Sequence, residues 1–414
     1  MKTRCFLLVL AIVMGIGPFA SMAAESKNAM DCETLVEGNN RFALDLYTSL
    51  AAEETFEGQN VFLSPYSVSS ALAMTWAGSM GETAGQMEKV LRFQMGSKKT
   101  HEAFHEFDTM LETFQEEEAV ELSVANSIWP QAGYPLKEDY VKLVRQNYGI
   151  TVTPVDYRGN AEVARETINS WVEGETNKKI TNLIGKNVLT PLTRLVLVNA
   201  IYFKGTWLHP FDAEATCKTP FHLNREETVE VPMMHQEGRF RYAEHKGMQA
   251  VELPYGKDNL SMLVLLPEEE KALEALEADL SVEELQQMSQ AMELRKVRVS
   301  LPRFEITWGT HSLKGVLKSH GMKIPFEAGQ ADFSNMAGEP GDLNIGDVLH
   351  KAFVKVSEEG TEAAAATAVI VVTRSATSEE VAVFRADRPF LFFIRENSTG
   401  AILFMGRCMN PKIA

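Results

Sequence analysis

Cysteine is scarce in this sequence, with four residues in a chain of 414. Cys5 lies in an N-terminal segment that we expect to be removed, which leaves Cys32, Cys217 and Cys408. Because this number is odd, at most one disulfide can form, and the sequence does not indicate which pair would form it. Stability must therefore come mainly from a hydrophobic core, which a chain of this length with 45% hydrophobic residues can build.

The sequence also lacks a linker rich in glycine, serine or proline, and it shows no internal repeat. Length alone would suggest roughly two or three domains. Without a linker to separate them, we predict one large domain over residues 30–414. Beyond the N-terminal segment, no apolar stretch is long enough to cross a bilayer.

Residues 1–24 have the features of a secretory signal peptide. Lys2 and Arg4 form a basic start, an apolar run follows, and Ser21-Met22-Ala23 places small residues where a signal peptidase requires them. The alternative, a membrane anchor, is disfavoured because the run is short and contains glycine and proline. We therefore predict a secreted, extracellular protein, with a periplasmic location as the alternative.

Basic residues are outnumbered, with 40 lysines and arginines against 56 aspartates and glutamates, for a formal net charge of -16. Such a charge disfavours binding to nucleic acid and to anionic membrane surfaces. The shortage is clearest between Gly360 and Phe384, where Arg374 is the only basic residue. We therefore predict neither nucleic acid nor membrane as a partner, and Arg374 stands out by its isolation.

The segment around Arg374 has conflicting secondary-structure preferences. The alanines at 363–366 favour a helix, whereas residues 369–373 favour a strand. Alternate side chains of a strand share a face, so one face of this segment would carry no charge. That face consists of Thr361, Ala363, Ala365, Thr367, Val369, Val371 and Thr373. An ordinary alanine-rich helix or buried strand is the alternative interpretation of the same composition.

Two runs of residues around this segment resemble the serpin family of serine protease inhibitors. Residues 358–367 read EEGTEAAAAT and residues 384–394 read FRADRPFLFFI, which are similar to the hinge and the signature of an antithrombin-like, Arg-Ser reactive-centre loop. In that family the specificity residue lies fourteen positions after the hinge glycine, which places the reactive bond between Arg374 and Ser375. The resemblance assigns the loop hinge to Gly360, Thr361, Glu362, Ala363, Ala364, Ala365, Ala366 and Thr367.

The resemblance implies an α+β serpin fold with three mostly antiparallel β-sheets, about nine helices and an exposed reactive-centre loop at about 358–384. It implies no enzymatic activity and no cofactor. The protein would be a monomeric suicide inhibitor that traps a trypsin-like serine protease as a covalent acyl complex, after cleavage at Arg374-Ser375 and insertion of the loop into the central sheet. A non-inhibitory serpin that acts as a binding or chaperone protein is the alternative. The uncharged Thr361, Ala363 and Ala365 favour the inhibitor, because a charged or bulky residue there would stall insertion.

Five polar residues are expected to lie beneath the central sheet. Ser64, Ser67 and His350 are residue types of a serine hydrolase, but no Gly-x-Ser-x-Gly elbow accompanies them. A proline directly after the first serine instead predicts that this serine caps a helix. The resemblance implies that the three residues form a hydrogen-bonded cluster with Asn60 and Asn199, the shutter, where the sheet must open.

A second group of residues, the breach, is expected where the loop enters the sheet. The resemblance places Trp207 near this point and pairs Arg303 with Glu358, two residues before the hinge glycine. We expect the ion pair to be exposed, so it would contribute only about 0.2–1 kcal/mol. Its use would be to hold the top of the sheet closed until the loop moves.

The run His101-Glu102-Ala103-Phe104-His105 matches the H-E-x-x-H pattern of zinc proteases. A zinc site also needs a third ligand, and the downstream His-x-x-Gly-x-x-His extension is missing. Many serpins begin the matching helix with His-Glu-x-Phe, so the resemblance explains the first histidine without a metal. We predict no metal site.

The same helix bears on heparin, which antithrombin-like serpins bind through basic residues on and near it. Here only Lys98 and Lys99 precede the helix. The region 101–118 is acidic, with Glu102, Glu106, Asp108, Glu112, Glu116, Glu117 and Glu118. We therefore predict no activation by heparin.

The remaining elements follow from hydrophobic periodicity. Helices are predicted over 34–50, 68–78, 138–148, 161–177 and the acidic stretch 268–292, and strands over 122–129, 195–203, 240–242, 250–254, 261–267, 390–394 and 401–406. Residues 297–306 are predicted to form a strand pair or a bend. The 195–203 stretch is apolar on both faces, which indicates a strand covered on both sides. Asn397-Ser398-Thr399 fits a glycosylation sequon, but a hairpin turn explains it more simply.

Overall fold

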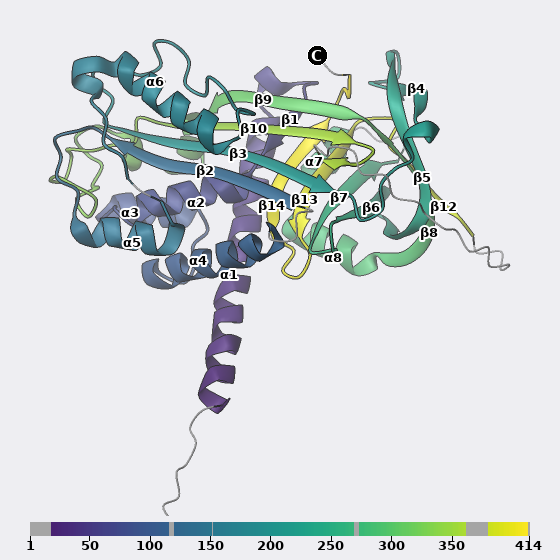
Figure 1. Cartoon of the computed structure of the whole chain (residues 1–414), viewed down its shortest axis with the longest axis horizontal. Helices are drawn as coiled ribbons and strands as arrows, with labels where there is room; N and C mark the ends of the chain where they lie inside the picture. Colours follow the sequence, from purple (N-terminus) through teal and green to yellow (C-terminus); the bar gives the residue numbers. More distant parts are fainter. Residues whose placement is uncertain (1–17, 116–119, 151, 269–272, 362–379, 413–414) are drawn as a thin grey trace, which may run out of the picture.

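A computed structural model describes residues 18–115, 120–150, 152–268, 273–361 and 380–412. These residues form nine α-helices and fourteen strands, and the strands join into two hydrogen-bonded sheets (Figure 1). The α+β fold class is confirmed. The reactive bond Arg374-Ser375 and the hinge residues 362–367 lie outside the described residues.

The helices of the described residues are α1 (Pro18–Ala51), α2 (Pro65–Trp76), α3 (Gly81–Val90), α4 (Ser97–Gln115), α5 (Glu138–Tyr148), α6 (Tyr157–Glu175), α7 (Leu273–Asp279), α8 (Val282–Ala291) and α9 (Lys314–Ser319). Four of the predicted helices correspond to α1, α2, α5 and α6, whereas the described part of the predicted helix over 268–292 forms two helices, α7 and α8. Ser64 caps α2 as predicted, since its Oγ accepts a hydrogen bond from the Ser67 N–H at 3.3 Å. α1 begins inside the segment predicted to be a signal peptide, which stays a prediction. In the described ranges no helix combines the length and the apolar character that a membrane span needs.

The five-stranded sheet has the order β2-β3-β11-β10-β9. Its strands are β2 (Val120–Pro130), β3 (Leu195–Thr206), β9 (Phe304–Ser312), β10 (Asp347–Ser357) and β11 (Gly360–Thr361). β2 and β9 pair antiparallel with their neighbours, whereas β3 and β10 run parallel to each other. Figure 1 shows α6 on one face of this sheet and α2 to α5 on the other.

Both faces of β3 are covered, as its sequence predicts. Leu195, Leu197, Ile201 and Phe203 belong to the main core, and Val196, Val198 and Ala200 belong to a second core beneath α6. Two-sided burial explains why this strand is a continuous apolar run rather than an alternating one. It also places the middle of the five-stranded sheet out of contact with water.

The second sheet contains β1 (Val61–Leu63), β4 (Cys217–His222), β5 (Thr228–His245), β6 (Met248–Tyr255), β7 (Leu260–Pro267), β8 (Glu293–Pro302), β12 (Ala382–Arg385), β13 (Phe390–Glu396) and β14 (Ile402–Cys408). The long β5 pairs with β4 near its start, with β8 along its middle and with β6 near its end. Two of the three sheets expected from the sequence are therefore joined by β5 into one hydrogen-bonded ladder.

The described cysteines are all free thiols. Cys408 is buried, Cys32 is half-buried and Cys217 is exposed. Burial, reinforced by the charges of Glu106 and Glu396, raises the pKa of Cys32 to about 11. The stability of the described fold therefore rests on packing, as the scarcity of cysteine indicates.

Candidate functional site

The first residues of the expected loop hinge lie inside the five-stranded sheet. Gly360 and Thr361 form β11, which pairs antiparallel with β3 on one side and with β10 on the other. Thr361 lies opposite Gly205 of β3 and Val356 of β10. The chain that follows β10 therefore turns back and starts a new strand between the two.

Next to β11, the sheet is closed. Residues 196–202 of β3 and 347–353 of β10 pair directly in parallel register, and we call this ladder the seam. A strand that continued β11 along the same line would have to separate the seam, because the seam uses the hydrogen-bonding edges that the new strand would need. The sheet is thus open for two residues at one end and shut beyond them.

Close packing determines which residues can stand at this entry. Gly360 has a φ of 151°, and a Cβ atom there would lie 2.0 Å from the carbonyl oxygen of Gly205, so only glycine fits. The buried Thr361 hydroxyl shares a hydrogen bond of 2.7 Å with the Tyr255 hydroxyl. The Tyr255 ring in turn stacks on Trp207, with 4.4 Å between ring centroids. No space or solvent is left at position 361 for a charged side chain.

The expected breach residues meet beside this entry. Trp207 donates its indole N–H to the carbonyl oxygen of Ser357 at 2.9 Å. Arg303 donates to Glu358 from Nε at 2.7 Å, and Thr216 donates its hydroxyl to the same carboxylate at 2.6 Å. Sequence reasoning missed Thr216, because nothing in its surroundings in the chain marks it.

The expectation that the Arg303–Glu358 pair is exposed is wrong. The Glu358 side chain is only 7% exposed, while that of Arg303 is 41% exposed. Glu358 lies in the turn between β10 and β11, where its carbonyl oxygen accepts the Phe211 N–H at 2.8 Å and the turn is held against this neighbouring segment. A buried carboxylate that loses its partner costs more than a surface pair, so the contribution is about 1–3 kcal/mol.

The charge state of Glu358 follows from these contacts. Burial by itself would raise the pKa of this carboxyl. Hydrogen bonds from Arg303 and Thr216 outweigh burial and bring the pKa below its usual value. Glu358 is therefore ionised at neutral pH, and the entry to the sheet carries a charged pair.

Four of the five expected shutter residues lie together at the seam. Asn199 and His350 stand opposite each other in the seam, and His350 Nδ1 donates a hydrogen bond to Asn199 Oδ1. Asn199 Nδ2 contacts Ser67 Oγ at 2.5 Å, and Ser64 donates its backbone N–H to His350 Nε2 at 3.1 Å. All four side chains are fully buried.

The shutter histidine is neutral. Burial lowers the pKa of His350 to about 3. Its two ring nitrogens have opposite roles, since Nε2 accepts from the Ser64 N–H while Nδ1 donates to Asn199. A proton added to Nε2 would remove the acceptor, so the cluster requires the neutral ring.

The structure corrects one shutter assignment and adds one residue. Asn60 instead holds the C-terminal segment: its Oδ1 accepts the N–H groups of Met409 and Asn410, and its Nδ2 donates to Asn410 O. Asn126 of β2 completes the cluster, because its Oδ1 accepts from Ser67 Oγ at 3.0 Å and from Asn199. A lone asparagine in an alternating strand gives no signal in the sequence that could have identified it.

The geometry does not assemble a serine hydrolase. His350 Nε2 contacts the backbone N–H of Ser64, and the Ser64 hydroxyl donates to the carbonyl oxygen of Leu403 at 2.6 Å. A general base must reach the hydroxyl that it activates. These groups therefore hold α2 and β14 against the sheet rather than attack a substrate.

The H-E-x-x-H run does not assemble a metal site either. His101 is buried and its Nδ1 lies 2.6 Å from the Tyr148 hydroxyl, whereas His105 is exposed on α4. Burial lowers the pKa of His101 to about 4, so the ring is neutral. Among the described residues, no group of three or more His, Cys, Asp or Glu side chains is arranged to hold a metal ion.

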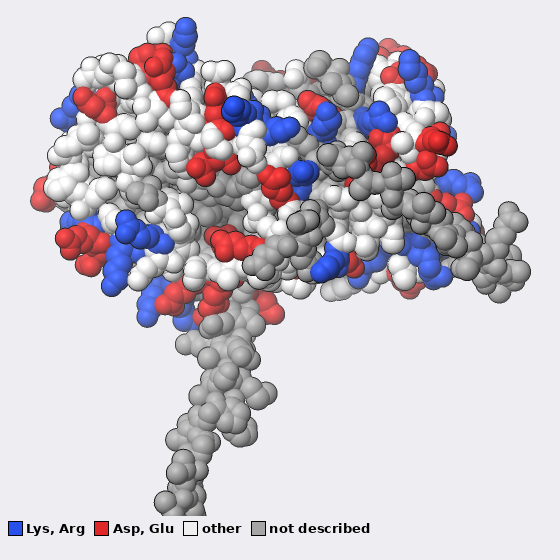
Figure 2. All heavy atoms as spheres, viewed as in Figure 1, with Lys and Arg blue, Asp and Glu red and all other residues white. Residues whose placement is uncertain are grey.

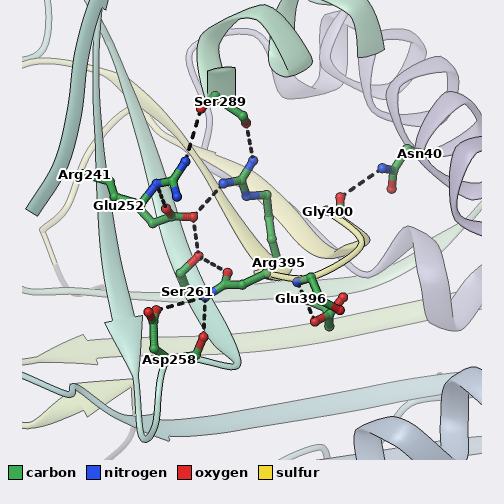
Figure 3. Close-up of polar contacts among 11 residues, drawn as sticks. Asn40, Arg241, Glu252, Asp258, Ser261, Ser289, Arg395, Glu396 and Gly400 are labelled. Carbon is green, nitrogen blue, oxygen red and sulfur yellow. Dashed lines mark hydrogen bonds and ion pairs between the residues drawn. The ribbon is translucent and has the colours of Figure 1, made fainter. Parts of the chain in front are cut away.

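A further buried polar network lies at the other sheet (Figure 3). Arg395 of β13 donates to Glu252 of β6 at 2.6 Å and to Ser289 of α8 at 2.9 Å. Glu252 also pairs with Arg241 at 3.1 Å. These contacts join α8 to three strands, and they supply stability rather than a binding site because their polar atoms face one another.

The run Asn397-Ser398-Thr399, which we predicted to be a hairpin turn, lies at the edge of this network. Asn397 donates both N–H bonds of its amide to Asp258, at 2.8 and 3.1 Å, and accepts from Ser261 at 2.6 Å. The next residues are held by Glu396, whose carboxylate accepts the N–H groups of Ser398 and Thr399 at 2.7 Å. The sequon residues are thus engaged in the turn that connects β13 to β14, as the hairpin interpretation expects.

Comparisons with known proteins agree with this arrangement. The profile of the family described as Serpin (serine protease inhibitor) matches residues 37–411. An uncharacterized serpin-like protein of Thermococcus kodakarensis is 43% identical over 91% of this chain and 86% of its own length, and the leukocyte elastase inhibitor of Homo sapiens is 39% identical over 92% of this chain and all of its own. The crystal structure of Serpin48 of the insect Tenebrio molitor superposes with a TM-score of 0.82, at 33% identity, over 91% of this chain and 98% of its own.

The first two residues of the expected loop already form a short strand between the parallel strands β3 and β10. This arrangement is that of a sheet that can accept a further strand. Together with matches that cover almost the whole chain, this architecture identifies the family. The chain belongs to the serpins.

Proposed function

We propose that this serpin is a secreted suicide inhibitor of trypsin-like serine proteases, cleaved at Arg374-Ser375. The observation that carries the proposal is β11: the loop starts as a strand between β3 and β10 and is aimed along the seam. Serpins are a known example of strand addition to a sheet. The isolated Arg374 is the residue that a protease with a carboxylate in its specificity pocket would select.

The reaction involves one bond exchange before the loop moves. The protease serine oxygen attacks the Arg374 carbonyl carbon, the peptide bond to Ser375 breaks, and Ser375 leaves with the proton as a free amine. Arg374 is then held to the protease as an ester. Insertion of the freed segment carries the protease away from its attack position before water can hydrolyse that ester.

The alternation begun by Thr361 predicts how the segment would lie when inserted. Thr361 points to the side of Tyr255 and the main core. Because strand side chains alternate, Ala363, Ala365, Thr367 and Val369 would follow to the same side. None of these residues is charged, which favours the inhibitor over the alternative, a non-inhibitory binding or chaperone serpin.

One gel separates these functions. Mature protein mixed with trypsin should give a covalent complex that resists boiling in SDS, and Arg374→Ala should abolish it. A non-inhibitory serpin would instead be cleaved without retaining the protease. Undiminished complex with Arg374→Ala would show that the reactive bond lies elsewhere. We also propose that the protein is a monomer and that heparin does not accelerate its inhibition of a protease. Stopped-flow inhibition rates with and without heparin would test the second point.

A further inference from the structure

A cavity of about 410 Å³ lies between α2, α4, the end of α5 and β2. Figure 1 shows these three helices on the side of the five-stranded sheet that faces away from α6. The cavity opens to solvent, because exposed residues of α4 form part of its rim. Cavities of about 300–1,000 Å³ hold small organic molecules. Apolar side chains from every neighbouring segment contribute to the wall, namely Met74, Leu111, Leu122 and Ile150.

The inner wall of the cavity contains a carboxylate. Asp108 of α4 is half-buried there, and its Oδ1 accepts a hydrogen bond from the Tyr66 hydroxyl at 2.6 Å. Among the described residues, the charge that shifts the pKa of Asp108 is that of Glu112, which is also negative. In this part of the chain Asp108 therefore has no positive partner.

The missing partner leaves Asp108 only partly ionised. Burial raises the pKa of this carboxyl to about 7, the hydrogen bond from Tyr66 offsets part of the rise, and the charge of Glu112 adds to it. An opposite charge within about 4–6 Å favours the ionised form of a carboxyl. A cation in the cavity would supply that charge and would gain a charge-assisted hydrogen bond.

Two aromatic rings of the wall are also suited to a cation. Tyr66 and Tyr148 both line the cavity, and the face of an aromatic ring attracts positive charge. The Tyr66 hydroxyl is occupied by Asp108, and the Tyr148 hydroxyl lies 2.6 Å from His101 Nδ1. Burial raises the pKa of both phenols, so both are neutral. The wall thus combines apolar surface, ring faces and one carboxylate.

Arg145 also lines the cavity, and its charge would favour an anion instead. This side chain is exposed, whereas Asp108 is half-buried, and exposed charges are screened more strongly by salt than buried ones. Figure 2 shows acidic and basic side chains side by side over α4 and α5, at the lower left of the view. The outer surface has no single sign there, so the groups inside the cavity decide the charge of the ligand.

We propose that this cavity binds a small organic cation, an amine on an apolar or aromatic body, with the amine against Asp108. The site goes beyond the proposed function, because it contains no residue of the reactive-centre loop. It adjoins the shutter, since Asn126 lines the cavity and also accepts the hydrogen bond from Ser67 Oγ.

The test measures binding of three probes of similar size to the mature protein by isothermal titration calorimetry at about pH 7. Phenethylamine is a cation, 2-phenylethanol is neutral and phenylacetate is an anion. The test variant is Asp108→Asn, which keeps the shape and an oxygen that can accept from Tyr66. The matched control is Asp139→Asn, which removes the same charge from the exposed first turn of α5, outside the lining of the cavity. Melting temperatures establish that both variants fold.

Phenethylamine should bind native protein with a dissociation constant of about 1 mM or lower, as its size allows. The neutral and the anionic probe should bind at least about tenfold more weakly. Asp108→Asn should weaken binding of phenethylamine at least about tenfold, and Asp139→Asn should change it less than about twofold. No binding of phenethylamine at about 10 mM, equal or tighter binding of either other probe, or equal effects of the two variants would overturn the cation site.

A second measurement keeps the proposal testable if Asp108→Asn does not fold. Because the pKa of Asp108 is about 7, pairing with the amine at that pH should release about half a proton from its carboxyl. Calorimetry in two buffers of different ionisation enthalpy measures the release. Histidine exchanges protons in the same pH range, so His105→Gln is the control, and the release should persist in it. Binding of phenethylamine without proton release would overturn the pairing with Asp108. None of these results depends on inhibition of a protease, so the covalent complex tests the proposed function separately.

Discussion

The two ends of the path that the loop would follow differ in chemistry. At the entry, β11 already separates β3 from β10, and the surrounding contacts include the charged pair Arg303–Glu358, which is partly open to water. At the seam, β3 and β10 are paired, and the contact across them is between His350 and Asn199, which are neutral and completely buried. The entry is thus prepared for a strand, whereas the seam is held shut.

This difference shows how one sheet can be stable before cleavage and still accept a strand afterwards. Separating the Arg303–Glu358 pair leaves one buried carboxylate without this partner, at a cost of about 1–3 kcal/mol, while the half-exposed Arg303 stays in contact with water. Opening the seam leaves several buried neutral groups unpaired, and each of them costs about 1–3 kcal/mol. We therefore expect the seam, not the entry, to set the resistance to insertion.

Thr361→Arg should have the largest effect, because it blocks the entry itself. The side chain would be buried against Tyr255 without a partner for its charge, and such burial costs several kcal/mol. Hydrolysis of the ester would then be faster than loop insertion. Trypsin should therefore cleave the variant and be released, and the amount of stable complex should fall by more than about a hundredfold. Thr361→Ser, which keeps the hydroxyl, is the control, and a persistent complex with the arginine variant would count against entry at this point.

Asn199→Ala should weaken the seam. It removes the contacts to Ser67, Asn126 and His350 and should lower the free energy of unfolding by about 2–4 kcal/mol. Asn60→Ala is the matched control, since it removes three hydrogen bonds away from the seam. For each variant we would measure the denaturant midpoint and the rate of spontaneous loop insertion on mild heating. If the two variants insert their loops equally fast, the seam does not set the resistance.

Acid should loosen the seam through His350. Its folded pKa of about 3 lies below the ordinary histidine value of 6.5, so the unfolded chain binds more protons. The stabilising contribution is complete above about pH 6.5 and is lost as pH falls toward 3. Between about pH 7.5 and 4.5, native protein should lose about 2–3 kcal/mol more than His350→Gln. His101→Gln reports the separate contribution of the other buried histidine, and identical pH profiles for native protein and His350→Gln would refute this role.

Arg303→Gln should have the smallest effect. The variant leaves the Glu358 carboxylate with the Thr216 hydroxyl and some water. The free energy of unfolding should therefore fall by about 1–2 kcal/mol, less than for Asn199→Ala at the seam. Since the folded pKa of Glu358 is lowered, the native contribution is present above the ordinary glutamate pKa and is lost as pH falls through the folded pKa. Lys355→Gln, which breaks a cross-strand pair with Glu305 on the same sheet, is the control and should cost less than about 0.5 kcal/mol. A loss at Arg303 as large as that for Asn199→Ala would reverse the ranking of entry and seam.

The helices, strands and caps that depend on neighbouring residues in the chain could be predicted from local sequence patterns. The helix over 138–148 has the bounds of α5, and the apolar run from Leu195 lies in a strand covered on both sides. The Ser64 cap was also predictable, because serine followed by proline has a defined meaning at a helix start.

The remainder depends on residues that meet only after folding. Asn126 joins the shutter from β2, and Arg395 finds Glu252 143 positions away in the chain. The burial of Glu358 was misjudged for the same reason, since Phe211 and Thr216 cover it from another part of the chain. The family resemblance could assign most residues of the breach and of the shutter. It misplaced Asn60, which binds the C-terminal segment in the folded protein.

We propose that the uncleaved sheet holds energy that a further strand releases. We would compare the melting temperature of the intact mature protein with that of molecules cut between Arg374 and Ser375 that carry no protease, after these are separated from the covalent complex. We expect the cleaved molecule to melt far above the intact one, because a full-length strand then replaces the seam. A cleaved molecule that melts at the same temperature or lower would contradict it.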